Sequence, residues 1–280
     1  MAESSQRTVG KTPRDSDSVR FWYVVDLLLL CVGPVALLAV FSVPIAVREE
    51  LVFRIASPRV VTAYTSHYIH LTESHLVGNL VSYVVVAPTA YVLCLQSHRR
   101  WLFRKALLTF LLVFPFALSA MQLAFDRHRQ LYGFSSINAA LFGLLCFAVV
   151  SYTSTHLSST VDETDAPALL FFIMAIITVL SVPSRAWMGE IVVLSVGIGL
   201  AYVVTLLSYI GIPEWDEVVD GWSGGRIEVG LLGLGVLLLF PFFGFNQQFT
   251  GDGAVFDLYT HLLGFCLAFI VVYVTAVILE

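Results

Sequence analysis

Charged residues are scarce in this chain, and their scarcity limits what kind of protein it can be. Asp, Glu, Lys and Arg make up 12% of the 280 residues, whereas hydrophobic residues make up 58% and the mean hydropathy is +0.85. A water-soluble domain carries roughly twice that share of charged residues. The composition therefore excludes an ordinary soluble protein and predicts an all-α, polytopic membrane protein.

Cysteine and lysine are also rare. The four cysteines, at positions 31, 94, 146 and 266, fall in apolar segments without paired or clustered spacing. We therefore expect small core residues rather than disulfides or metal ligands. The loops are acidic and Lys11 and Lys105 are the only lysines beside 13 arginines. Such surfaces suit high salt and favour a prokaryotic cell membrane, with ordinary drift in composition as the alternative. No nucleic-acid partner is expected.

Long apolar runs set the predicted architecture. A helix that crosses a hydrocarbon core roughly 30 Å thick needs about 20 mostly apolar residues. Eight segments meet or approach this length, and the fifth is the shortest: 21–47, 74–96, 103–124, 135–152, 167–183, 189–211, 227–245 and 258–279. The polar residues 1–20 contain no apolar run, so we expect a disordered cytoplasmic tail rather than a signal peptide. Residues 21–280 then form one transmembrane domain.

Basic residues in the loops predict the orientation. With the N-terminus inside, the inner regions hold nine Lys and Arg residues and the outer regions six, and the first two inner regions hold eight of the nine. An excess of Lys and Arg marks the cytoplasmic side. We therefore expect a cytoplasmic N-terminus and, with eight spans, a cytoplasmic C-terminus.

Three of the predicted spans begin with polar side chains. His75 and Asn79 lie at the start of the second span, Ser135 at the start of the fourth and His261 near the start of the eighth. All three spans run from outside to inside, which places these residues roughly 5–10 Å below the outer boundary. Polar groups at that depth are costly unless they have partners, so together they predict a site.

Small residues follow the same helix faces as the serine and the histidine. The two stripes are Ser135, Ser136, Ala139, Ala140 and Gly143 in the fourth span, and Gly264 and Ala268 beside His261 in the eighth. Stripes of this kind let membrane helices approach closely, although they are also common as general packing surfaces. Packing along them would bring the Ser135 hydroxyl near the His261 imidazole.

This pair supports nucleophilic chemistry. A serine hydroxyl becomes an effective nucleophile when a base takes its proton, and neutral His261 can do so. No Asp or Glu occurs at comparable depth in these three spans, so we predict a dyad rather than a triad. His75 and Asn79 are four residues apart on one helix face and can donate to an oxyanion, together with the Ser135 backbone N–H.

The order of these motifs resembles the rhomboid family of intramembrane serine proteases. That family has His and Asn at the start of its second helix, Gly-x-Ser-Gly at the start of its fourth, and a His followed three residues later by Gly in its last core helix. The matching residues here are His70, His75, Asn79, Gly133, Ser135, His261 and Gly264. The resemblance implies that Ser135 is the nucleophile, His261 the base, and His75 and Asn79 the oxyanion donors. It also implies that His70 braces the first loop.

The resemblance carries expectations about fold and activity. It implies a six-helix rhomboid-like core, here with two additional transmembrane helices, about eight in total. It also implies a serine endopeptidase that cleaves single-pass transmembrane proteins near the outer face of the lipid bilayer, with no metal or organic cofactor. Span 227–245 would take the place of the family's gating helix, and Asn246 to Asp257 would cap the site.

Departures from the family pattern define the alternatives. The glycine after the serine is replaced by Ser136, whose side chain could crowd the oxyanion pocket. Thr260 precedes the histidine, and position 268 is alanine rather than glycine. A catalytically inactive relative that binds membrane proteins is therefore the second reading.

Two further readings concern the remaining polar residues of the spans and loops. A metal or proton transporter would use His67, His70 and His75. Asn138, Gln122 and His67 also suit the simpler role of joining helices through hydrogen bonds. The substrate, the cleavage site and the oligomeric state stay open.

Overall fold

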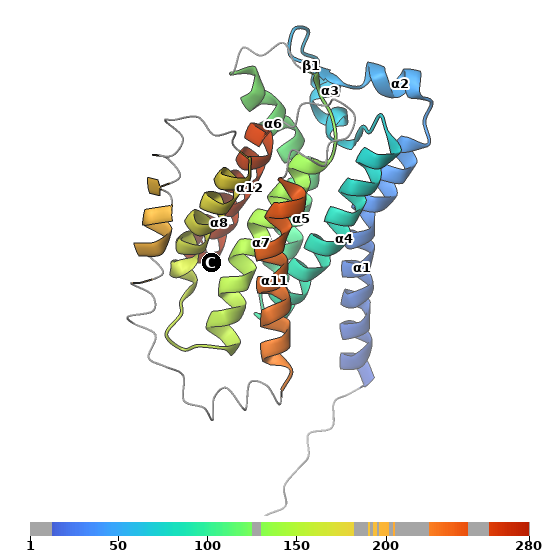
Figure 1. Cartoon of the computed structure of the whole chain (residues 1–280). Coiled ribbons are helices and arrows are strands. Elements are labelled where there is room, and N and C mark those ends of the chain that lie inside the picture. Colours follow the sequence, from blue (N-terminus) through green and yellow to red (C-terminus); the bar gives the residue numbers. More distant parts are fainter. Residues whose placement is uncertain are drawn as a thin grey trace, which may run out of the picture.

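The computed structural model describes residues 13–124, 130–181, 224–245 and 258–279, and scattered positions between 190 and 204. The described residues form a helical bundle with one small antiparallel ribbon, in which β1 (Phe53–Arg54) pairs with β2 (Gln130–Leu131) (Figure 1). The predicted sixth span, 189–211, lies mostly outside the described residues, as do residues 1–12 and the expected cap at 246–257.

Long apolar helices confirm an integral, multi-pass membrane protein. Five helical stretches in the described part of the chain are long and apolar enough to cross a membrane. They lie in α1 (Pro13–Phe41), α4 (Glu73–Gln96), α7 (Ser135–His156), α11 (Arg226–Gly244) and α12 (Leu258–Tyr273), the last continued by the π-helical turn η4 (Val274–Leu279). A bent helix pair brings the number to six if it forms one span. The predicted fifth span is α8 (Ala166–Ser181), a helix too short for that test.

Helix α1 differs from the predicted first span, 21–47, at both ends, because it begins earlier and ends earlier. Helix α1 ends at Phe41, and a separate short helix, α2 (Ile45–Glu50), follows Pro44. A proline disfavours helical backbone at the residue before it, which separates the two helices at Val43. At the other end, α1 begins at Pro13, inside the segment expected to be a disordered tail.

The third predicted span, 103–124, is a bent pair rather than one straight helix. Helices α5 (Arg100–Leu112) and α6 (Phe114–Leu123) meet at 49°. Pro115 has no backbone N–H, so it leaves the Leu111 carbonyl without its helical partner. The hydroxyls of Tyr64 and Tyr68 donate to that carbonyl instead, at 3.2 and 2.6 Å. The bend therefore anchors α3 (Val60–Thr65) and the 3-10 turn η1 (Ser66–Tyr68).

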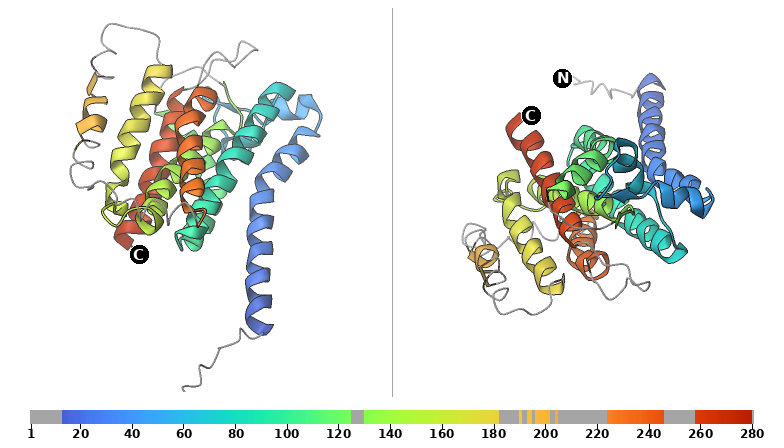
Figure 2. Two further views of the ribbon diagram at one scale, coloured as in Figure 1. Left: turned by 60° about the horizontal axis from the view of Figure 1, so that its bottom comes forward. Right: turned by 90° about the horizontal axis from the view of Figure 1, so that it is seen from above.

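Helix α7 forms the centre of the bundle. Its side chains are buried from Ser136 to Tyr152, and it contacts α12 and α4 most extensively (Figures 1 and 2). A helix that is apolar on all sides is suited to such a position. By contrast, α1 stands at the edge of the bundle and exposes large apolar side chains such as Leu27 and Val35 (Figure 2).

The α7–α12 interface is unusually close. A Cβ atom added at Gly264 would lie 2.5 Å from the Ser136 carbonyl oxygen, and one at Gly143 would lie 2.5 Å from the Phe265 carbonyl oxygen. Neither position has room for a side chain. The predicted packing of the two small-residue stripes is confirmed.

Candidate active site at the start of three helices

Ser135 is the first residue of α7, and the turn before it is shaped by Gly133. This glycine has a φ of 108°, in the region that residues with a Cβ rarely adopt. A Cβ here would also lie 2.5 Å from Cε1 of the His75 ring. His75 therefore packs directly on the backbone two residues before Ser135, as a site that uses both groups requires.

His70 joins the first loop to the same turn. It is fully buried, and its ring lies 4.9 Å from that of His75. The Phe134 N–H donates to His70 Nε2 at 3.4 Å, so Nδ1 carries the proton and donates to the Tyr68 carbonyl at 3.3 Å. Arg48 donates to the His70 carbonyl. Burial, with His75 nearby, lowers the pKa of His70 to about 3, so the ring is neutral near pH 7.

Asn79 links α4 to α7 one turn below His75. Its Nδ2 donates to the His75 carbonyl at 2.9 Å. Asn138 of α7 donates to both the Asn79 carbonyl and its side-chain oxygen, at 3.0 and 3.1 Å. Because an amide nitrogen carries two hydrogens, Asn79 keeps a second N–H beyond the one given to His75. The expected role of Asn138 in joining helices is confirmed.

His261 lies in the first turns of α12 and is buried. Its ring centroid is 6.1 Å from that of Phe245, just after α11, and it lies close enough to His75 for an electrostatic interaction. The neighbouring Thr260 hydroxyl accepts a hydrogen bond from Gln122 of α6, which confirms Gln122 as a link between helices.

The register of α7 on α12 fixes the level of the serine and the histidine. Ala139 faces Gly264, and four residues further on Gly143 faces Ala268. Since both helices advance together, one turn back from Ala139 reaches Ser135 at the level of residues 260–261. No direct hydrogen bond between the Ser135 hydroxyl and the His261 ring occurs in the described structure, so that contact stays a prediction.

Ser136, which replaces the motif glycine, has a partner that sequence reasoning missed. His67 Nδ1 lies 2.9 Å from Ser136 Oγ, and His67 Nε2 lies 3.1 Å from Ser119 Oγ of α6. The Ser119 hydroxyl donates to the Ala63 carbonyl at 2.8 Å. Ser119 must then accept from His67 Nε2–H, and Ser136 must donate to Nδ1. The Ser136 hydroxyl is thus directed at His67.

This chain of buried hydrogen bonds holds His67 in its neutral form. His67 and Ser136 are almost fully buried, and burial lowers the pKa of His67 to about 4. The partners are 69 and 52 residues away from His67 along the chain, so no local sequence pattern could reveal them. The only available signal was the serine at the glycine position of the motif.

The histidines do not gather into one ligand set. Both ring nitrogens of His67 contact serine hydroxyls, whereas His70 and His75 face the turn before Ser135. Within the described ranges, no group of three or more His, Cys, Asp or Glu side chains could hold a metal ion.

Comparisons with protein-family models, with curated proteins and with solved structures find no match for this chain. The resemblance to rhomboid proteases therefore rests on the sequence motifs.

Proposed function

We propose that this protein is an intramembrane serine endopeptidase in which Ser135 is the nucleophile and His261 the base. The observation that supports the proposal is the register of α7 on α12, where Gly264 packs against the Ser136 carbonyl oxygen and Gly143 packs against the Phe265 carbonyl oxygen. The His75 ring against Gly133 adds a third group to the same place. The substrates would be single-pass transmembrane proteins.

The proposed reaction begins when Ser135 Oγ attacks the carbonyl carbon of a peptide bond. His261 takes the hydroxyl proton and then gives it to the leaving amine, which yields an acyl-enzyme ester on Ser135. Water then attacks the ester, with His261 again as base, and releases the new carboxyl group. No cofactor is needed for either half of the reaction.

The negative oxygen that forms at each step requires hydrogen-bond donors. Ser135 stands at the N-terminus of α7, where backbone N–H groups have no helical partner. Asn79 can supply its second amide N–H, and His75 can supply a ring N–H. Removing one such donor typically costs about 100- to 1000-fold in rate.

Helix α11 would control access to this site. It contacts α4 and α7, and Phe245 at its end touches the His261 ring. Its other face exposes large apolar residues, including Leu231, Leu239 and Phe243. A substrate helix in the lipid would enter between α11 and α4. We assign the site to the outer side of a prokaryotic membrane, with the N-terminus in the cytoplasm.

A fluorophosphonate probe tests the proposal, because it reacts covalently only with an activated serine. The wild-type protein in detergent should be labelled, and Ser135→Ala and His261→Ala should abolish labelling. Ser42→Ala, which removes an exposed hydroxyl that donates to the Ala39 carbonyl, is the matched control and should label like the wild type. A labelled Ser135→Ala variant would refute Ser135 as the nucleophile.

The second candidate is a catalytically inactive relative that binds transmembrane helices. The observation that favours it is the replacement of the motif glycine by Ser136. A folded but unlabelled wild type would support this candidate, and labelling regained in Ser136→Gly would identify the replacement as the cause.

A further inference from the structure

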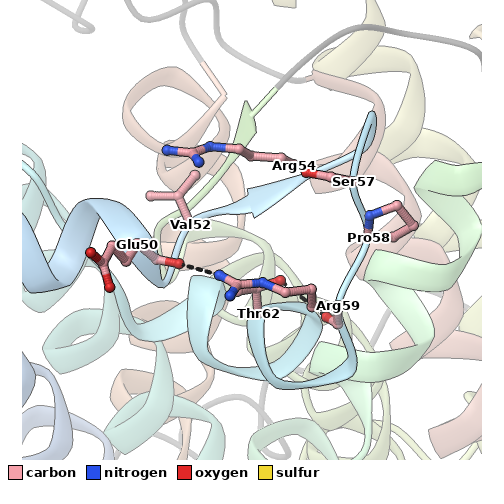
Figure 3. Close-up of a pocket in the computed structure, with 7 residues that line it drawn as sticks. All are labelled: Glu50, Val52, Arg54, Ser57, Pro58, Arg59 and Thr62. Atoms are coloured by element: carbon pink, nitrogen blue, oxygen red, sulfur yellow. Dashed lines mark hydrogen bonds between the residues drawn. The ribbon is translucent and has the colours of Figure 1, made fainter.

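A separate pocket lies beside the candidate active site, in the loop between α1 and α4. It has a volume of about 480 Å³ and is enclosed by the end of α2, by β1 and by the turn into α3 (Figure 3). Its lining includes Glu50, Val52, Arg54, Ser57 and Arg59. None of these residues has a part in the proposed hydrolysis.

Among the residues that the structure describes, two guanidinium groups in this pocket have no carboxylate partner. Arg59 donates to the backbone carbonyl of Glu50 at 2.7 Å, and Arg54 donates to that of Glu49 at 3.4 Å. Neither arginine forms an ion pair with a carboxylate in the described ranges, whereas Arg100 and Arg104 at the other end of the bundle both do. Each guanidinium has five N–H donors, so most remain for a ligand.

The orientation of these side chains suits an anion. Figure 3 shows both guanidinium groups on the Val52 side of the pocket, with the Glu50 carboxylate directed away from Arg59. Arginine forks match the oxygen geometry of a phosphate group. With two positive groups and one negative group in the lining, the pocket favours a singly charged phosphodiester over inorganic phosphate, which carries nearly two charges at neutral pH.

Exposed aliphatic residues beside this pocket favour a position at the membrane surface. Val60 and Val61, next to Arg59, are 77% and 63% exposed, and Ile45 on α2 is 51% exposed. In a protein that crosses a bilayer, aliphatic side chains beside arginines are typical of the boundary between acyl chains and headgroups. The phosphate groups of lipids lie at this depth.

We propose that the pocket binds the phosphate group of an anionic lipid headgroup through Arg54 and Arg59, with Ser57 as a further donor. The lipid is identified only by this chemistry, a phosphodiester with a net negative charge. The proposal depends on the membrane location of the chain and is independent of any hydrolysis at Ser135.

Titration of a fluorescent phosphatidylglycerol against the protein in neutral detergent micelles tests this site. Replacing both arginines in Arg54→Gln/Arg59→Gln should weaken binding roughly 10- to 30-fold, since each basic residue near an anionic lipid raises the affinity roughly three- to five-fold. Arg20→Gln, toward the other end of α1, removes one positive charge outside the pocket and should bind like the wild type. Glu50→Gln should bind more tightly, because it removes the negative side chain of the described lining.

Two further measurements decide the source of the phosphate and the integrity of the variants. The paired change Arg54→Lys/Arg59→Lys keeps the charge and should retain more binding than the glutamine pair, which shows that a loss is not unfolding. If only inorganic phosphate binds, detected as a rise in melting temperature that the glutamine pair lacks, the phosphate chemistry is upheld and the lipid source is wrong. Equal lipid binding by the wild type, the glutamine pair and Arg20→Gln would overturn the proposal.

Discussion

The two ends of the helix bundle hold their buried polar groups by different means. At the end where α4, α7 and α12 begin, neutral histidine, serine and asparagine side chains form hydrogen-bonded chains. At the opposite end, Asp26 of α1 is buried and pairs with Arg100 and Arg104 of α5. We call these the Ser135 end and the Asp26 end.

The comparison shows how each kind of network suits its place. Fixed charges at the Asp26 end bind α1 to α5, and the Tyr91 hydroxyl of α4 also donates to Asp26. Charges of this kind hold helices together. Neutral imidazoles at the Ser135 end can accept or donate a proton, which a hydrolase requires.

The largest loss of stability is expected when the ion pairs at the Asp26 end are removed. Asp26→Ala leaves two arginines without their buried carboxylate, and such a loss costs about 3 to 5 kcal/mol of unfolding free energy. Thermal unfolding in detergent measures it. Glu49→Ala removes an exposed carboxylate and should change stability by less than about 0.5 kcal/mol. A cost for Asp26→Ala no larger than that of the control would show that these ion pairs contribute nothing.

Lowering the pH should destabilise the folded protein at the Ser135 end, because His67 is buried there in its neutral form. The folded pKa of His67 is about 4, below the ordinary value near 6.5. Between these values the unfolded chain takes up a proton that the folded chain refuses, so this stability is present above pH 6.5 and is lost as the pH falls toward 4. The loss is on the order of 3 kcal/mol.

Unfolding measured from pH 7 to pH 4 detects this dependence. The variant His67→Gln lacks this titrating imidazole, so its stability should fall less steeply than that of the wild type. Parallel curves for the two proteins would rule out His67 as the source of the acid sensitivity.

A smaller effect is expected from the packing of α12 on α7. In Gly264→Ala the new methyl group meets the Ser136 carbonyl oxygen, and overpacking of this kind costs about 1 to 3 kcal/mol. The matched control is Gly235→Ala in α11, where a Cβ meets nothing within 4 Å. Fluorophosphonate labelling should fall in Gly264→Ala and persist in Gly235→Ala. Equal stability of the two variants would contradict the close approach.

The smallest effect concerns the bend between α5 and α6. Tyr68→Phe removes the hydroxyl that donates to the Leu111 carbonyl and should cost about 1 kcal/mol. In the background of Pro115→Ala, the alanine N–H can supply the missing helical bond, so the same tyrosine change should cost less. Chemical unfolding of the four proteins measures the difference, and an unchanged cost would show that the proline does not create the need for Tyr68.

Much of the helical arrangement was predictable because hydrophobic length and small-residue spacing are local properties. The segments 74–96, 135–152 and 227–245 correspond to α4, α7 and α11 within a few residues. The bend at Pro115 and the break at Pro44 were not predicted, although both prolines are visible in the sequence. A proline permits a break, but the partners that stabilise it, such as Tyr64 and Tyr68, come from elsewhere in the chain.

The candidate site was also predictable only in part. Ser135 follows Gly133 in the chain, and the motif order together with the helix directions indicated that His75 would lie at the same end of the bundle, where its ring packs on Gly133. The direction of the Ser136 side chain was not predictable. The sequence suggested crowding of the oxyanion pocket, whereas the structure directs this hydroxyl toward His67.

By itself, the sequence determined that the chain crosses a membrane, which residues could form a serine and histidine pair, and which helix faces could meet. These follow from composition and periodicity, which act within one helix at a time. Only the tertiary structure decided which buried groups became partners: Asp26 with two arginines, and His67 with two serines. The physical reason is that a buried polar group is stabilised by whatever donor or acceptor the packing brings to it, and packing joins residues that lie far apart in the chain.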